Sequence, residues 1–137
     1  MKTFTLIGAI AITIATTGVT TAVAADKFDL GKHEYDSNCV ACHGNNLKGG
    51  AYVDFLKVTP PDLTLLSKKN GGVFPLERVY NVIDGRQEVK GHGPRDMPVW
   101  GDYFAAEKTG ASKSAKEQDV AARIEALVVY LQSLQAK

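Results

Sequence analysis

The sequence has little of what marks several protein classes. Its 137 residues include only two cysteines, three histidines, one tryptophan and two methionines. It contains neither an internal repeat nor a low-complexity tract, which excludes a solenoid. With 45% apolar and 23% charged residues, the composition is that of a folded soluble protein. The length suits one domain and leaves little room for a second.

Charged residues are missing from the beginning of the chain. After Lys2, no charged residue occurs from Phe4 to Ala25, and small residues precede Asp26. This pattern predicts a secretory signal peptide, residues 1–25, cleaved after Ala25 or one residue earlier. The alternative is an uncleaved membrane anchor, because the uncharged run is nearly long enough to span a bilayer. Its six threonines and two glycines favour cleavage. We expect a periplasmic protein of residues 26–137, free of the membrane once the signal is removed.

An excess of either charge is also missing. Without residues 1–25, 112 residues remain, with 15 basic and 15 acidic side chains. This balance argues against nucleic acid as a partner, since nucleic-acid binding calls for a basic excess. A local positive face is still compatible with the scattered lysines, although a solvated surface explains each of them. These lysines are Lys48, Lys57, Lys68, Lys69 and Lys90.

The two cysteines lie in the sequence Cys39-Val40-Ala41-Cys42-His43. Cys-x-x-Cys-His is the attachment signal for c-type haem. On a helical turn, positions i, i+3 and i+4 share one face. Cys39 and Cys42 can therefore form thioethers to the porphyrin edge while the His43 imidazole reaches the iron from one side. The motif predicts one covalent haem c.

Three other interpretations of the cysteines are weaker. A thioredoxin-type dithiol requires a βαβ context, and no parallel-strand pattern is present. A zinc site requires four ligands, and only His33 and His92 would remain to complete one. A disulfide across so short a loop would stabilise the fold little. Only haem attachment explains the histidine directly after the second cysteine.

The second axial ligand is predicted to be Met97, the one methionine after residue 25. It lies in a segment from Gly91 to Gly101 whose glycines and prolines forbid a regular helix. Histidine and methionine together raise the potential of electron-carrying haems. The alternative ligand is His92, which would give a bis-histidine haem. His33 is interpreted as a solvent-facing helical histidine.

Three motifs together resemble the class I c-type cytochromes of bacteria, most closely the small single-haem periplasmic members. They are Gly31-Lys32-His33-Glu34-Tyr35, Cys39-Val40-Ala41-Cys42-His43-Gly44 and Met97-Pro98-Val99-Trp100. The resemblance implies an all-α cytochrome c fold, His43 and Met97 as axial ligands, and maturation by haem-attachment machinery. It also implies that the carbonyl of Pro60 or Pro61 accepts a hydrogen bond from His43. The long polar segment from Gly101 to Ser114 departs from the family pattern, and a flexible surface loop is expected there.

The apolar pattern independently predicts four helices. They cover residues 29–39, residues 62–69, a segment from Pro75 to a stop at Gly85, and a last helix that begins at the capping box Ser114-Ala115-Lys116-Glu117. By the resemblance, the last helix crosses the first, with Tyr35 against Leu127 or Leu131. The inward-facing candidates are Leu30, Tyr35, Leu63, Leu66, Leu76, Val79, Tyr80, Ile83, Ile124, Leu127, Val128, Leu131 and Leu134.

Arg86 and Trp100 are candidate donors to the haem propionates, whose charges need partners when partly buried. With both axial positions filled, no site for a substrate remains, so the sequence predicts an electron carrier with unidentified redox partner proteins rather than an enzyme. The alternatives are a haem subunit bound tightly to a larger dehydrogenase or reductase, and an open-iron sensor or peroxidase.

Overall fold

The computed structural model describes residues 19–86 and 97–136. Within these two ranges the protein is helical and contains no strand, so the all-α prediction is confirmed. The helices are α1 (Val19–Asn38), α2 (Val40–His43), α3 (Leu66–Lys69), α4 (Leu76–Asp84), α5 (Trp100–Glu107) and α6 (Lys113–Ser133), with 3-10 turns η1 (Val53–Phe55) and η2 (Leu63–Leu65).

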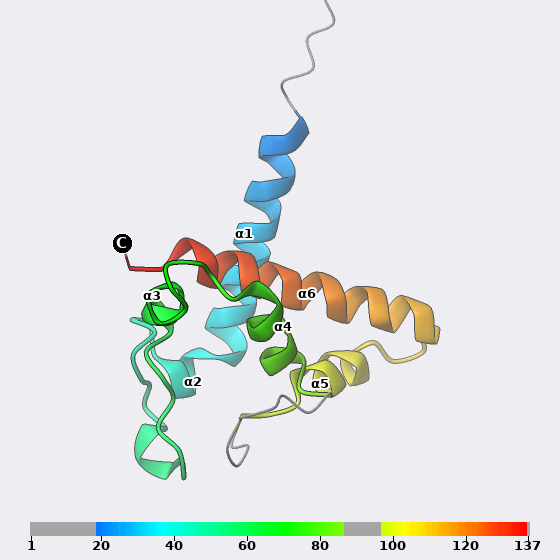
Figure 1. Ribbon diagram of the computed structural model, residues 1–137. Helices are drawn as coiled ribbons and strands as arrows, with labels where there is room; N and C mark the ends of the chain where they lie inside the picture. The colour runs from blue at the N-terminus through cyan, green and yellow to red at the C-terminus, as the bar shows by residue number, and fades with distance from the viewer. Residues whose placement is uncertain (1–18, 87–96, 137) are drawn as a thin grey trace, which may run out of the picture.

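The core lies where α1 crosses α6 (Figure 1). At the crossing, a Cβ added to Gly31 would lie 2.0 Å from the carbonyl oxygen of Ala126, so the two helices meet there without an intervening side chain. Tyr35, one turn further on, is fully buried beside the ring of Tyr130. The predicted inward position of Tyr35 is confirmed. Leu30 was wrongly predicted to face inward: it is 37% exposed, because the close approach is centred on its neighbour.

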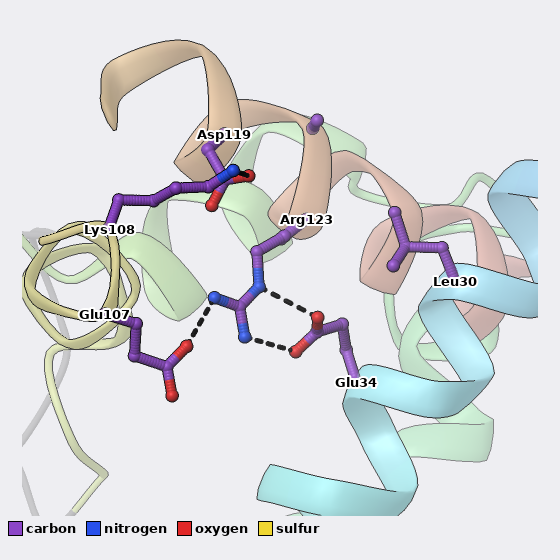
Figure 2. A pocket seen from close by; sticks show the side chains of 7 residues that line it. Leu30, Glu34, Glu107, Lys108, Asp119 and Arg123 are labelled. Atoms are coloured by element: carbon purple, nitrogen blue, oxygen red, sulfur yellow. Dashed lines mark hydrogen bonds and ion pairs between the residues drawn. The ribbon is translucent and has the colours of Figure 1, made fainter. Parts of the chain in front are cut away.

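A charged pair joins the same two helices. Two nitrogens of Arg123 on α6 donate to the two carboxylate oxygens of Glu34 on α1, each at 2.8 Å. The third donates to Glu107 at the end of α5, and the guanidinium lies 3.8 Å from the ring centroid of Phe104. Figure 2 shows Arg123 between the two carboxylates. Glu34 is buried in consequence of this pairing, since a buried carboxylate requires a partner.

The expectation of a flexible surface loop from Gly101 to Ser114 is wrong, because α5 occupies its first half. Trp100 and Phe104 lie one helical turn apart, and their rings are in contact. Phe104 is completely buried, and Arg123 of α6 covers its ring. The helix therefore depends on burial against α6. The four-residue spacing of Trp100 and Phe104 is the feature of the sequence that indicates this helix.

The middle helices follow the predicted boundaries closely. Asp62 caps the 62–69 region by accepting a hydrogen bond from the Thr64 backbone N–H at 2.9 Å, and η2 continues directly into α3. Pro75 directly precedes α4, which ends at Gly85 in the left-handed conformation with φ 69°. Of the predicted inward side chains of α4, Val79 and Ile83 are buried, whereas Leu76 is exposed because it lies in the first turn, ahead of the crossing with α6.

The last helix begins earlier than the capping box suggested. Ser112, and not Ser114, is the N-cap, and its Oγ accepts from the Ala115 backbone N–H at 3.2 Å. Glu117, the acidic end of the predicted box, is instead bound by Arg86. The predicted apolar stripe is confirmed, with Ile124, Leu127, Val128 and Leu131 buried.

Helix α1 runs through the predicted cleavage site at Ala25, and the cleavage itself stays a prediction. None of the helices in the described part of the chain is long and apolar enough to cross a membrane.

Candidate functional site

The Cys-x-x-Cys-His motif forms a single helical turn at the end of α1. Cys39 is the N-cap of α2, and His43 is the last residue of that helix. The backbone N–H groups of Cys42 and His43 both donate to the carbonyl of Cys39, at 3.2 and 2.9 Å. This is the helical geometry that places positions i, i+3 and i+4 on one face. The two sulfurs and the imidazole therefore belong to one turn, as the motif predicted.

The segment after His43 folds back against this turn. The N–H groups of Gly49 and Gly50 donate to the carbonyls of His43 and Cys42, both at 2.9 Å. A Cβ added to Gly50 would lie 2.3 Å from the carbonyl oxygen of Ala41. Glycine is needed here because the returning backbone passes directly over α2. These bonds hold the Cys-x-x-Cys-His turn in place.

Tyr35 supports the same turn from the core. Its buried hydroxyl donates a 2.7 Å hydrogen bond to the carbonyl of Gly44, the residue after His43. Sequence reasoning treated Tyr35 as a packing residue only. The sequence does contain an indication of this positioning role, because Tyr35 lies four residues before Cys39, one helical turn away.

The state of the thiols favours attachment over redox exchange. Both cysteines are free of a disulfide. Burial, followed by the nearby carboxylate of Glu34, raises the pKa of Cys39 to about 12. Reactive dithiols have a lowered pKa, because the thiolate is the nucleophile. A thiol that stays protonated at neutral pH is unsuited to thioredoxin-type exchange.

The imidazole of His43 has the properties of a metal ligand. Burial lowers its pKa, which keeps the ring neutral, the form that binds metals. Its Nδ1 is buried and has no hydrogen-bond partner among the described residues. The predicted bond to the carbonyl of Pro60 or Pro61 is therefore not formed in this structure, although both prolines are described, Pro60 half-buried and Pro61 exposed. A neutral imidazole and two free thiols on one turn fit a covalent haem with His43 as ligand.

Met97 and Trp100 lie against the same core as the motif. Both are partly buried hydrophobic residues packed on the central cluster, as is Cys39. Trp100 begins α5 and contacts the rings of Tyr103 and Phe104. Met97 as the second ligand, and Trp100 as a propionate donor, stay predictions. His92, the alternative ligand, lies outside the described residues.

Arg86 has different partners from those predicted. All three of its guanidinium nitrogens already donate to the carboxylates of Asp84 and Glu117. The contacts of Arg86 in the structure therefore do not support a role in binding a haem propionate, and that role stays a prediction.

A shallow pocket of about 370 Å³ lies elsewhere, around the Arg123 network. Its charged groups are paired with one another, as Lys108 with Asp119 and Arg123 with Glu34 and Glu107. None of the predicted haem-binding residues lines it. Over the described ranges, no group of three or more His, Cys, Asp or Glu side chains could hold a metal ion. These residues therefore give no support to the zinc interpretation of the cysteines.

Comparison with known proteins gives one match. The family model described as Cytochrome c matches residues 28–135. No curated protein and no solved structure matches the chain significantly. The matched range includes the Cys-x-x-Cys-His turn, Met97 and the crossing of α1 with α6.

Proposed function

We propose that this chain, which belongs to the cytochrome c family, is an exported carrier of single electrons that holds one haem between His43 and Met97. Haem-based electron transfer and a covalent c-type haem follow from the family. The observation that carries the finer proposal is the helical turn of Cys39, Cys42 and His43, with its neutral, buried imidazole.

Each residue of the site has a separate task. Cys39 and Cys42 attach the haem through thioethers, which prevents its loss outside the cell. His43 is held from two sides, by the return of Gly49 over its carbonyl and by the bond from Tyr35 to Gly44. The haem supplies a reversible one-electron change at its iron, tuned by axial ligands, burial and hydrogen bonds.

Met97 determines the class of function in this proposal. If its thioether occupies the remaining axial position, the protein offers no position for a substrate or a gas, and only electrons pass. Redox partners would then dock briefly through small interfaces, typical of electron-transfer encounters.

The decisive experiment is a spectroscopic redox titration of the purified haem protein, with and without carbon monoxide. We expect a haemochrome spectrum for one haem per chain, a charge-transfer band from methionine sulfur to ferric iron, and little carbon monoxide binding at neutral pH. Replacement Met97→Leu should remove the band and open the iron to carbon monoxide. As a control, Leu134→Met adds a methionine at the half-buried C-cap of α6 without removing Met97, and should leave both properties unchanged.

A wild-type protein without the band, or one that binds carbon monoxide readily, would contradict ligation by Met97. N-terminal sequencing of the exported protein tests the leader, with Asp26 or Ala25 expected as the first residue. Purification as a stable complex with a larger redox enzyme would contradict the free carrier.

A further inference from the structure

Arg86 sits at the centre of an ion network that the proposed electron transfer does not use. Its Nε donates to Asp84 at 2.6 Å, and its Nη1 donates to both oxygens of Glu117 at 3.0 and 2.9 Å. The hydrogen bond to Asp84, with a further contribution from Glu117, raises the pKa of Arg86 above its ordinary value. Such forked charge-assisted pairs are stronger and more directional than single bonds. The network joins the end of α4 to the second turn of α6.

The network also holds the start of α5. A Cβ added to Gly101 would lie 1.8 Å from Oδ1 of Asp84 and 2.5 Å from Nε of Arg86. The backbone of Gly101 therefore packs directly on the ion pair. Its φ is not positive, so glycine is required for this close approach and not for its conformation. A side chain at position 101 would displace the Asp84 and Arg86 side chains or α5 itself.

Met97 lies between the two parts of this contact in the sequence. Arg86 and Gly101 touch, and the chain that connects them includes Met97, four residues before Gly101. Pro98 and Val99 alone separate Met97 from α5, so the position of the first turn of α5 restricts where the Met97 side chain can lie.

Helix α5 cannot fix Met97 by itself. It has eight residues, and its N-cap, Val99, has no side-chain hydrogen bond. Helices this short are marginal without tertiary contacts. At the far end of α5, Glu107 pairs with Arg123 of α6, and the next residue, Lys108, pairs with Asp119 of α6. At the end next to Met97, the Asp84–Arg86–Glu117 network supplies the charged contacts.

We infer that Asp84, Arg86 and Glu117 act as a clamp that positions Met97 for iron ligation, and that Arg86 is its central positioning residue. This inference rests on the proposed function, in which Met97 is the sixth ligand. Loss of the clamp raises the fraction of molecules in which the sulfur is away from the iron, while the helices stay folded.

The test measures binding of imidazole to the oxidised haem protein, because imidazole takes the sixth position only when Met97 leaves it. Thermal unfolding followed by circular dichroism is measured on the same samples. We expect Arg86→Gln to bind imidazole about tenfold more tightly than the wild type, which is about 1.4 kcal/mol. Gly101→Ala, which changes no charge, should act in the same direction, and Arg86→Lys should restore part of the loss, because an ammonium keeps the charge but not the fork.

Lys27→Gln is the matched control. It also removes one positive charge and an ion pair to α6, that with Glu125, but neither residue belongs to α4 or α5, so imidazole affinity should not change. If Arg86→Gln is too unstable to purify, Glu117→Gln removes only the more exposed arm and should tighten imidazole binding by about threefold, within the range of exposed ion pairs.

Each outcome decides the matter. Tighter binding in the Arg86 and Gly101 variants, but not in Lys27→Gln, supports the clamp. Equal affinities in all variants, or an equal increase in Lys27→Gln, overturn the clamp and leave the ligation by Met97 standing. If the wild type already binds imidazole as tightly as Met97→Leu, the ligand assignment fails, and the clamp fails with it.

Discussion

The crossing of α1 with α6 and the segment from Gly44 to Pro75 both carry large apolar side chains but are built differently. At the crossing, side chains such as Tyr35, Ile124 and Leu127 are almost completely buried. In the segment from Gly44 to Pro75, Leu47 is buried, but several large apolar side chains lie at the surface, and Phe55 is 84% exposed. Burial is therefore continuous at the crossing and local in the segment.

The open segment is held by its backbone. The N–H of Leu63 donates to Leu47 at 2.9 Å, and the turns at η1 and η2 are closed by local bonds. The chain after α6 adds support, because Gln135 bonds to the carbonyl of Leu63 and the N–H of Ser67. We expect the crossing to supply most of the stability. In the chain, the Cys-x-x-Cys-His turn lies between α1 and the open segment.

The largest effect should come from breaking the crossing itself. Gly31→Ala places a methyl group against the carbonyl of Ala126 and forces the helices apart. We expect the free energy of unfolding to fall by about 3 kcal/mol, measured by chemical denaturation of the haem protein. Gly71→Ala is the control from the open segment, where φ is +67° and no atom lies near. It should cost about 1 kcal/mol for its left-handed backbone. Equal losses in the two variants would contradict the close approach.

An intermediate effect is expected at the boundary. Tyr35→Phe removes the bond to Gly44 and leaves its carbonyl only the longer 3.2 Å bond from the Leu47 backbone N–H, which should cost about 1 kcal/mol at neutral pH. Burial raises the pKa of Tyr35 above its ordinary value of 10.0. The folded protein therefore keeps this proton longer than the unfolded chain, and the stability from Tyr35 is present below pH 10 and declines as the pH rises further.

The phenylalanine variant cannot lose that contribution. The stability difference between wild type and Tyr35→Phe should therefore narrow above pH 10, measured by urea denaturation across the alkaline range. A difference that stays constant or widens would show that the Tyr35 hydroxyl is not buried as described. The positioning role of Tyr35 would fail separately, if the variant left the spectrum and potential of the haem unchanged.

The residues of the candidate site were predictable where one short motif carries the chemistry. Cys39, Cys42 and His43 form a single turn, so their spacing in the sequence fixes their relation in space. The boundaries of α4 were predictable for a similar reason, since Pro75 and Gly85 act on the backbone next to them.

The remaining features depend on partners distant in the sequence. Glu117 fits a local capping box, yet Arg86 binds it from 31 residues away. Periodicity identified the buried face of α1 but not the crossing at Gly31, which leaves Leu30 at the edge. The local sequence pattern shows which face of a helix is apolar. It does not show which distant residue or helix that face will contact.

The smallest effect is expected in the open segment. Phe55→Ala removes one of the largest apolar side chains of the protein, but Phe55 is mostly exposed and makes an edge contact with Tyr52, at 6.4 Å between ring centroids. We expect the free energy of unfolding to change by less than about 0.5 kcal/mol. Gly31→Ala, measured in the same denaturation series, shows that a loss would be detected. A loss above about 1.5 kcal/mol would contradict the exposed position of Phe55. It would show that the segment after the Cys-x-x-Cys-His turn also contributes substantially to stability.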